Sequence, residues 1–307
     1  MQKNSLYAII KSARLHHTIN SGLNTKVNTI SMSLLSSSEH IVTRHSPEGD
    51  YSFVHFAEGS PHLVDVSRRI HADCYSRLGF VKPESIENGF FADGIDKARG
   101  MNVDFTIGFP KGTDPQDSSG MRGSYRSVSA ESDNGLEALP SYLLCKDNIT
   151  PAGHRLLERD VSRTKEIATL SGEDSASVYY MLREAIANGM PNQERWFFGI
   201  VSSTYDKLNS MFGPNAMKQI GSPTKIPDNR VGDHIRIIPA FVETKTFVDT
   251  VAKNFALAKD ERSRRKIGGT LLFCVEGIDN SELSVRTNLT VSAIKLMQQG
   301  KGRQRNV

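Results

Sequence analysis

The chain is predicted to be an α/β protein with helices on both faces of a mixed sheet. A buried strand at 166–171, a helix at 175–188 and a second buried strand at 196–201 form a β-α-β unit. Alternating segments at 103–109 and 121–130, joined by a turn-rich stretch, form a hairpin and add antiparallel strands. Hydrophobic residues make up 38% of the 307 positions, which is enough for a sizeable core.

The folded part is expected to be one domain at 51–245 between two extensions. Residues 1–50 are rich in Ser, Asn, Thr and His and are predicted to form a flexible leader. Residues 246–307 are predicted to be a C-terminal extension. Its elements are a helix around Val251, a basic turn at 260–266, a strand at 270–276 and a polar end.

Hydrophobic periodicity and turn residues place the elements within the domain. The segment 51–57 alternates like a strand, and 62–80 has apolar residues at helical spacing. The rest is assigned in order: a turn-rich run (83–99), a hairpin linker (111–120), a Pro-containing connection (135–144), a charged helix-like run (154–165), a short helix (204–213) and a strand (234–244).

Composition excludes several classes of function. Lys and Arg number 38 and Asp and Glu 34, so the net charge of +4 does not fit a polybasic nucleic-acid binder, although it favours an acidic partner slightly. No apolar stretch is long enough to span a membrane and no secretory signal begins the chain, so a cytoplasmic protein is expected. Cys74, Cys145 and Cys274 are far apart, which predicts buried thiols rather than disulfides or a zinc site.

The start of the helix at 175–188 is the first candidate site. The helix N-terminus follows a buried strand, and backbone N–H groups there favour an anion such as a phosphate. The alternative is a plain capped helix start, and the carboxylate of Asp174 argues against an anion at this position.

The segments EIATLS, SASVYYMLREAIANG and WFFGIVSSTYDKLNSMFG resemble the second half of bacterial autoinducer (acyl-homoserine lactone) synthases and long-chain N-acyl amino acid synthases. These are N-acyltransferases of the GNAT type. The first half is similar more loosely, and together the matches span roughly half of the chain. The matching positions, in order, are Arg69, Tyr75, Phe80, Asp93, Asp96, Gly123, Arg126, Glu166, Val201, Ser202 and Gly213.

This resemblance implies the acyl-CoA N-acyltransferase fold, with a mostly antiparallel twisted sheet whose two central strands splay apart. It implies transfer of a fatty acyl group to the amine of a small acceptor, with no permanently bound cofactor. Thr169 stands where autoinducer synthases carry Arg, and Asp73 where they carry an aromatic residue, which favours an amino acid over S-adenosylmethionine as acceptor. The absence of a coenzyme A pyrophosphate loop favours phosphopantetheine on an acyl carrier protein over acyl-CoA as donor.

Acid–base and acceptor-binding roles have explicit alternatives. Glu166 is predicted to orient or deprotonate the acceptor amine; equally weighted is a strand-end Glu paired with Arg163 or Lys165. The resemblance also assigns acceptor binding to Asp93, Asp96, Arg126 and Arg69. The alternative for Asp93 and Asp96 is a turn without a ligand, that for Arg126 is a structural brace, and that for Arg69 is a solvated helix face.

The donor is expected to lie along the strand at 166–171, where backbone amides polarise the thioester carbonyl. The residues assigned to donor binding are Ala168, Thr169, Leu170, Ser175, Ser177 and Ser202. The residues assigned to an acyl-chain pocket are Tyr179, Met181, Trp196 and Phe198, and their alternative is ordinary core. No metal site is predicted.

Three functions therefore follow from the sequence. The first is an N-acyltransferase that joins a fatty acyl group from an acyl carrier protein to an amino acid. The second is a lactone autoinducer synthase or a coenzyme A-dependent acetyltransferase. The third is a non-catalytic binding module that keeps the fold.

Overall fold

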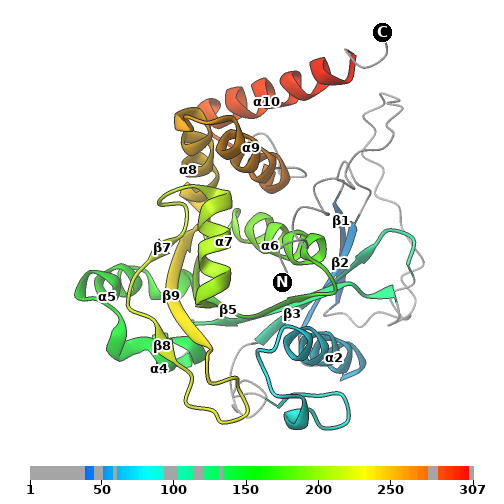
Figure 1. Cartoon of the computed structure of the whole chain (residues 1–307), viewed down its shortest axis with the longest axis vertical. Helices are drawn as coiled ribbons and strands as arrows, with labels where there is room; N and C mark the ends of the chain where they lie inside the picture. The colour runs from blue at the N-terminus through cyan, green and yellow to red at the C-terminus, as the bar shows by residue number, and fades with distance from the viewer. Residues whose placement is uncertain are drawn as a thin grey trace.

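A computed structural model describes residues 39–44, 51–57, 61–92, 103–113, 120–130, 134–275 and 283–303. These residues form one nine-stranded sheet with helices on both faces (Figure 1). The main path of the sheet is β1-β2-β3-β4-β5-β6-β9-β7, and β8 pairs with β9. All pairings are antiparallel except β5 with β6. The predicted α/β fold with a mostly antiparallel sheet is confirmed.

Six strands (β2, β3, β4, β5, β6 and β9) lie where the hydrophobic pattern predicts them, whereas β1, β7 and β8 were not predicted. The strands are β1 (His40–Arg44), β2 (Tyr51–Ala57), β3 (Val103–Pro110), β4 (Gly123–Ser129), β5 (Thr164–Gly172), β6 (Arg195–Val201), β7 (Lys218–Gln219), β8 (Thr224–Lys225) and β9 (Arg236–Glu243). The predicted hairpin is present, with Gly108 of β3 opposite Gly123 of β4. Within the predicted leader, β1 pairs with β2 at the edge of the sheet; residues 1–38 lie outside the described residues.

Two groups of helices cover the sheet. One face carries α2 (Pro61–Arg77), α4 (Pro140–Cys145) and α5 (Pro151–Glu158), and the other carries α6 (Ser175–Gly189) and α7 (Ser202–Phe212) (Figure 1). Beyond α6 and α7 lie α8 (Thr244–Leu257), α9 (Glu261–Val275) and α10 (Val285–Arg303). One hydrophobic cluster fills each side of the sheet, so the sheet is buried on both faces where β3 to β6 and β9 lie.

The C-terminal part corrects one expectation. The predictions of a basic turn at 260–266 and of a strand at 270–276 are wrong, because the single helix α9 (Glu261–Val275) occupies nearly all of both segments. Asp260 accepts a hydrogen bond from the Ser263 N–H at 2.8 Å and thereby caps the helix. Ile267, Leu271 and Cys274 are buried at helical spacing.

Two assignments before β5 also change. The connection at 135–144 contains a 3-10 turn (Gly135–Ala138) and α4, with Pro140 in the first helical turn. In the charged run at 154–165, α5 ends at Glu158 and a 3-10 turn (Val161–Arg163) follows before β5.

In the described residues, no helix is both long and apolar enough to cross a membrane.

All three cysteines are buried free thiols, as predicted. Burial raises the pKa of Cys145 and of Cys274 to about 12. Because the thiolate is the reactive form, we expect no reaction of the native protein with an aromatic disulfide reagent at pH 8, and reaction of all three thiols after unfolding in guanidinium. The release of coloured thiol measures this; a fast phase in the native protein would contradict the buried positions.

Glu194 gives the fold a pH dependence. Its burial raises the pKa of the carboxyl above its ordinary value, against the opposing effect of Lys165, whose Nζ lies 2.8 Å from Oε1. The contribution of such a group is complete below its unfolded pKa and is lost as pH rises through the higher folded pKa. We therefore expect the free energy of unfolding of the wild type, minus that of Glu194→Gln, to fall as pH rises from about 4 to 7. Urea unfolding across this range tests it, and a difference that stays flat would refute it.

Candidate functional site

The sheet opens between β5 and β6, the one parallel pair among the described strands. β5 and β6 pair from Thr164↔Arg195 to Glu166↔Phe197. After this point β5 continues to Gly172 and β6 to Val201, but among the described residues no strand pairs with β5 on the β6 side. On its other side β5 stays paired with β4 along its length. A strand edge with free hydrogen-bonding capacity therefore lies inside the sheet rather than at its rim.

β5 also carries an irregularity beside this opening. Thr169 lies opposite Arg126 and Ile167 lies opposite Ser127, so Ala168 is an extra residue in β5. Such a β-bulge leaves its extra residue out of the ladder and bends the strand. The bulge therefore bends β5 two residues after its last pairing with β6.

Glu166 lies at the vertex where the two strands separate. Its side chain is 0% exposed. Both carboxylate oxygens lie 3.0 Å from the backbone N–H of Ser141, which donates to them from the first turn of α4. The alternative partners from the sequence are engaged elsewhere: Arg163 pairs with Asp160, and Lys165 pairs with Glu194.

Arg126 shares this face of the sheet with Glu166. Side chains alternate along a strand, so Arg126 and Val128 of β4 point to one side, and Glu166 is opposite Val128. Arg126 is 1% exposed, and its Nε donates to the Oγ1 of Thr169 at 3.0 Å. The structure thus brings together Glu166, Arg126, Ala168 and Thr169. Leu170 points to the other face and packs against the cluster under α6.

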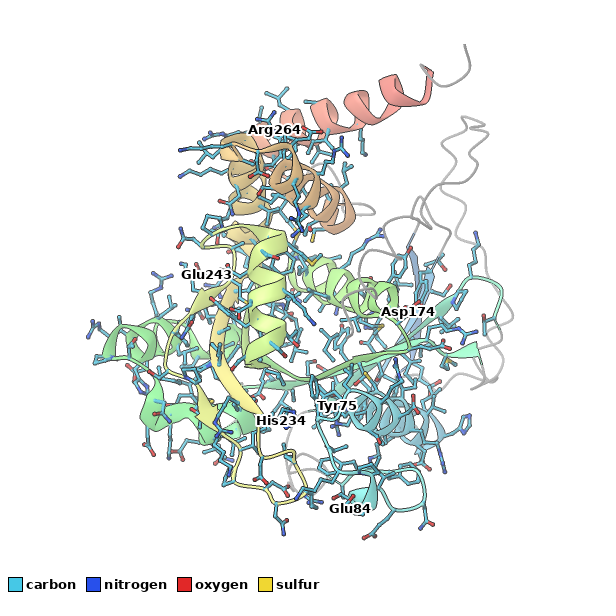
Figure 2. All side chains as sticks on the ribbon, in the orientation of Figure 1. Tyr75, Glu84, Asp174, His234, Glu243 and Arg264 are labelled. Atoms are coloured by element: carbon cyan, nitrogen blue, oxygen red, sulfur yellow. The ribbon has the colours of Figure 1, made fainter. Side chains whose placement is uncertain are left out.

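The far half of β5 is held by α2. His71 Nδ1 lies 3.1 Å from Ser171 Oγ, and Arg77 Nη2 donates to the carbonyl of Gly172. The chain after α2 forms backbone hydrogen bonds with the segment before β9. The Lys82 N–H donates to the Arg230 carbonyl, and the Gly232 N–H donates to the Phe80 carbonyl. The far half of β5 is thus fixed to α2, and the chain after α2 is in turn bonded to the segment before β9. Figure 2 labels Tyr75 and His234 in this region.

The N-terminus of α6 already holds a carboxylate. Asp174 Oδ1 accepts a hydrogen bond from the Ser177 N–H at 2.7 Å, and Figure 2 shows Asp174 at this end of the helix. Glu173 precedes it and pairs with Arg122. A pyrophosphate here would meet two carboxylates, so the capped-start alternative fits this helix end. The side chains of Ser175 and Tyr179 lie outside the described ones.

Ser202 and Arg69 occupy separate places. Ser202 begins α7 directly after β6, and its hydroxyl donates to the Arg236 carbonyl at 3.1 Å. Arg69 is exposed on α2, where it donates to the Asn88 carbonyl and stacks over the Phe90 ring. Arg69 therefore braces the turn at 88–90 and does not join Glu166. Asp93 and Asp96 lie outside the described residues.

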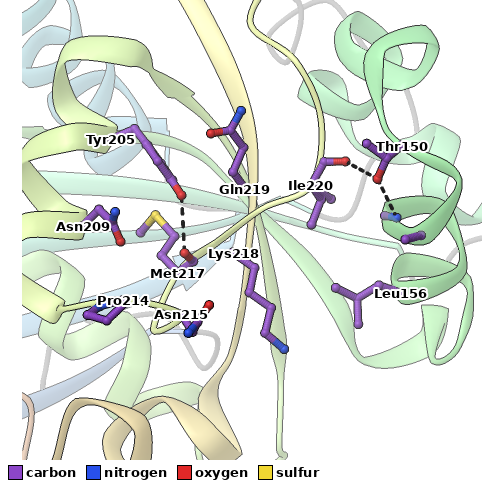
Figure 3. A pocket seen from close by; sticks show the side chains of 12 residues that line it. Thr150, Leu156, Tyr205, Asn209, Pro214, Asn215, Met217, Lys218, Gln219 and Ile220 are labelled. Atoms are coloured by element: carbon purple, nitrogen blue, oxygen red, sulfur yellow. Dashed lines mark hydrogen bonds between the residues drawn. The ribbon is translucent and has the colours of Figure 1, made fainter. Parts of the chain in front are cut away.

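Met181, Trp196 and Phe198 belong to the hydrophobic cluster under α6 and α7. Met181 is 0% exposed and lies over the facing glycines Gly108 and Gly123. Two pockets of the structure, about 430 and 390 Å³ in volume, are lined by none of these three residues. The larger, about 430 Å³, lies between α5, α7 and β7 (Figure 3), where Tyr205 Oη donates to the Met217 carbonyl.

Sequence reasoning missed Ser141 as a partner of Glu166, because the connection at 135–144 was not recognised as containing a helix. The available signal was Pro140, a residue favoured at the first position of a helix. Within the described part of the chain, no group of three or more His, Cys, Asp or Glu side chains is arranged to hold a metal ion. Comparison of the chain with known proteins gives no match to a family model, a curated protein or a solved structure.

Proposed function

We propose that the chain is an N-acyltransferase of the GNAT type, which moves a fatty acyl group from a carrier-bound thioester to the amine of an amino acid. The observation that carries the proposal is the separation of β5 from β6 immediately after Glu166. It leaves an open strand edge beside a buried carboxylate, in the middle of the sheet.

The open edge suits the arm of the donor. Phosphopantetheine is an extended chain with two amide groups, and an extended amide-bearing ligand can pair with a free strand edge as an added strand does. The thioester carbonyl at the end of such an arm would come to the vertex. Backbone N–H groups of β5 near the bulge at Ala168 would then polarise the carbonyl and stabilise the oxyanion.

Glu166 is assigned the role of base. Attack on a thioester needs the acceptor amine in its free form, and a carboxylate at the vertex can take the proton directly or through one water. The amine attacks the thioester carbon, the C–S bond breaks, and the thiol of the carrier leaves with a proton. Arg126, buried on the same face, is the proposed partner for the carboxylate of the amino acid.

The choice of donor rests on electrostatics. Coenzyme A brings a pyrophosphate, whereas carrier-bound phosphopantetheine has a single phosphodiester. The start of α6 is capped by the carboxylate of Asp174 and preceded by that of Glu173, which favours the donor with fewer negative charges. The small positive net charge of +4 favours an acidic carrier protein by long-range attraction.

Two assays test the proposal. Purified protein should discharge a fatty acyl carrier protein in the presence of an amino acid mixture, and lipid extracts from an overexpressing host should contain N-acyl amino acids by mass spectrometry. Acyl lactones would identify a lactone synthase instead, and turnover of acetyl-CoA alone an acetyltransferase. Tight binding of the acyl carrier without discharge would identify a non-catalytic module.

A further inference from the structure

Ser141 connects the two strands at the point where they separate. Its backbone N–H donates to Glu166 of β5, and its side chain lies against Gly199 of β6. A Cβ atom placed on Gly199 would lie 2.5 Å from Ser141 Oγ and 2.7 Å from Ser141 Cβ. Both distances are well inside van der Waals contact, so any side chain at position 199 requires Ser141 to move.

A displacement of Ser141 reaches Glu166 directly. The Cβ that would be pushed and the N–H that donates belong to the same residue, at the start of a helix of only six residues. Ser141 is the backbone donor to both oxygens of Glu166. A hydrogen bond lengthened by a few tenths of an ångström is already weakened, and a buried carboxylate depends on such donors for its charge.

We propose that Gly199 is a positioning residue for Glu166: the missing side chain lets α4 approach β6 closely enough for Ser141 N–H to hold the carboxylate charged and oriented at the vertex. The contact itself rests on geometry, and its catalytic meaning rests on the proposed function. Hydrogen bonding to the charged form of an acid favours that form, so loss of the donor favours the protonated acid, which is no base.

The variant Gly199→Ala tests this, with Ser141→Gly as its matched rescue. Ser141→Gly removes both atoms that collide with the new methyl group but keeps the N–H donor. Ser141→Gly alone is the reference against which the double variant is compared. Gly199→Ala should lower kcat by about tenfold or more at pH 7, with the acidic limb of the pH–rate profile moved to higher pH. The double variant should match Ser141→Gly in both kcat and pH–rate profile, so that Gly199→Ala has no further effect once the colliding atoms are gone.

Two results would overturn the proposal. One is a folded Gly199→Ala protein with an unshifted pH profile. The other is a folded double variant that stays as slow as Gly199→Ala. A purely structural role for Gly199 would lower stability and yield of active protein but would leave the profile of the folded fraction unchanged.

A measurement without substrate separates this proposal from the proposed function. The destabilisation caused by Gly199→Ala should grow as pH rises from about 4 to 8, because the variant favours the protonated carboxyl in the folded state and stability is lost as that proton leaves. In a Glu166→Gln background the same substitution should cost an amount independent of pH. If no variant transfers acyl groups but this pH dependence is found, only the proposed function fails; a pH-independent cost in both backgrounds refutes the role of Gly199.

Discussion

Glu166→Gln is expected to lower the turnover of acyl transfer by about 10²-fold or more while the protein stays folded. The amide has the shape of the carboxylate, and its oxygen can still accept the Ser141 N–H that both carboxylate oxygens now share. What the variant loses is the basic group at the vertex of β5 and β6. Initial rates of carrier discharge, measured with saturating amino acid, give the change in kcat.

Glu194→Gln is the matched control, because Glu194 is also buried but lies just before β6, at the end of the strand away from the opening. Glu194→Gln should alter how the free energy of unfolding depends on pH and leave kcat within a factor of about two of the wild type. A Glu166→Gln protein that melts normally and turns over at the wild-type rate would remove Glu166 from the chemistry, and the carboxylate would then be only a partner of α4.

The strands and helices around the site could be predicted from the sequence because each has a clear hydrophobic period. The helix starting at Ser175 and the strands at β5 and β6 differ from their predicted bounds by at most two residues. The helix α9 could not be predicted from the sequence. The run TLLFCV is mostly apolar and fits either a strand or a buried helix, and Gly268-Gly269 is a pair of residues typical of turns. The capping carboxylate of Asp260 was the overlooked sign of a helix.

The candidate site was predictable only in part for a different reason. Glu166 could be singled out because it opens the predicted strand at 166–171, at the position where the synthases that the sequence resembles carry a Glu. The contacts of Glu166 depend on tertiary packing. Nothing in the sequence of α4 indicates that Ser141 lies beside Glu166, and Gly199 matters only because Ser141 lies against it. No periodicity within one segment encodes such a contact. The position of Arg69 on the turn at 88–90, away from Glu166, is equally a matter of packing.

Met181→Ala is expected to destabilise the protein by about 2–5 kcal/mol, the usual cost of emptying a fully buried site. Met181 covers a place where two strands carry no side chains: a Cβ on Gly108 would lie 2.7 Å from its Sδ, and one on Gly123 would lie 2.8 Å from its Cγ. The facing glycines and the methionine are therefore complementary in volume. Urea unfolding of the single variant measures the cost.

The complementarity predicts a coupling that an acyl-chain pocket would not show. Gly108→Ala alone should cost about 1–3 kcal/mol through overpacking against Met181. Combined with Met181→Ala, the new methyl group enters the space that the side chain vacates, so the double variant should be more stable than the sum of the singles by about 0.5–3 kcal/mol. Leu157→Ala, in the cluster on the opposite face, is the control and should add to Met181→Ala within about 0.5 kcal/mol. If Met181→Ala instead leaves stability unchanged and lets the protein transfer longer acyl chains, Met181 lines an acyl-chain pocket and the core interpretation is wrong.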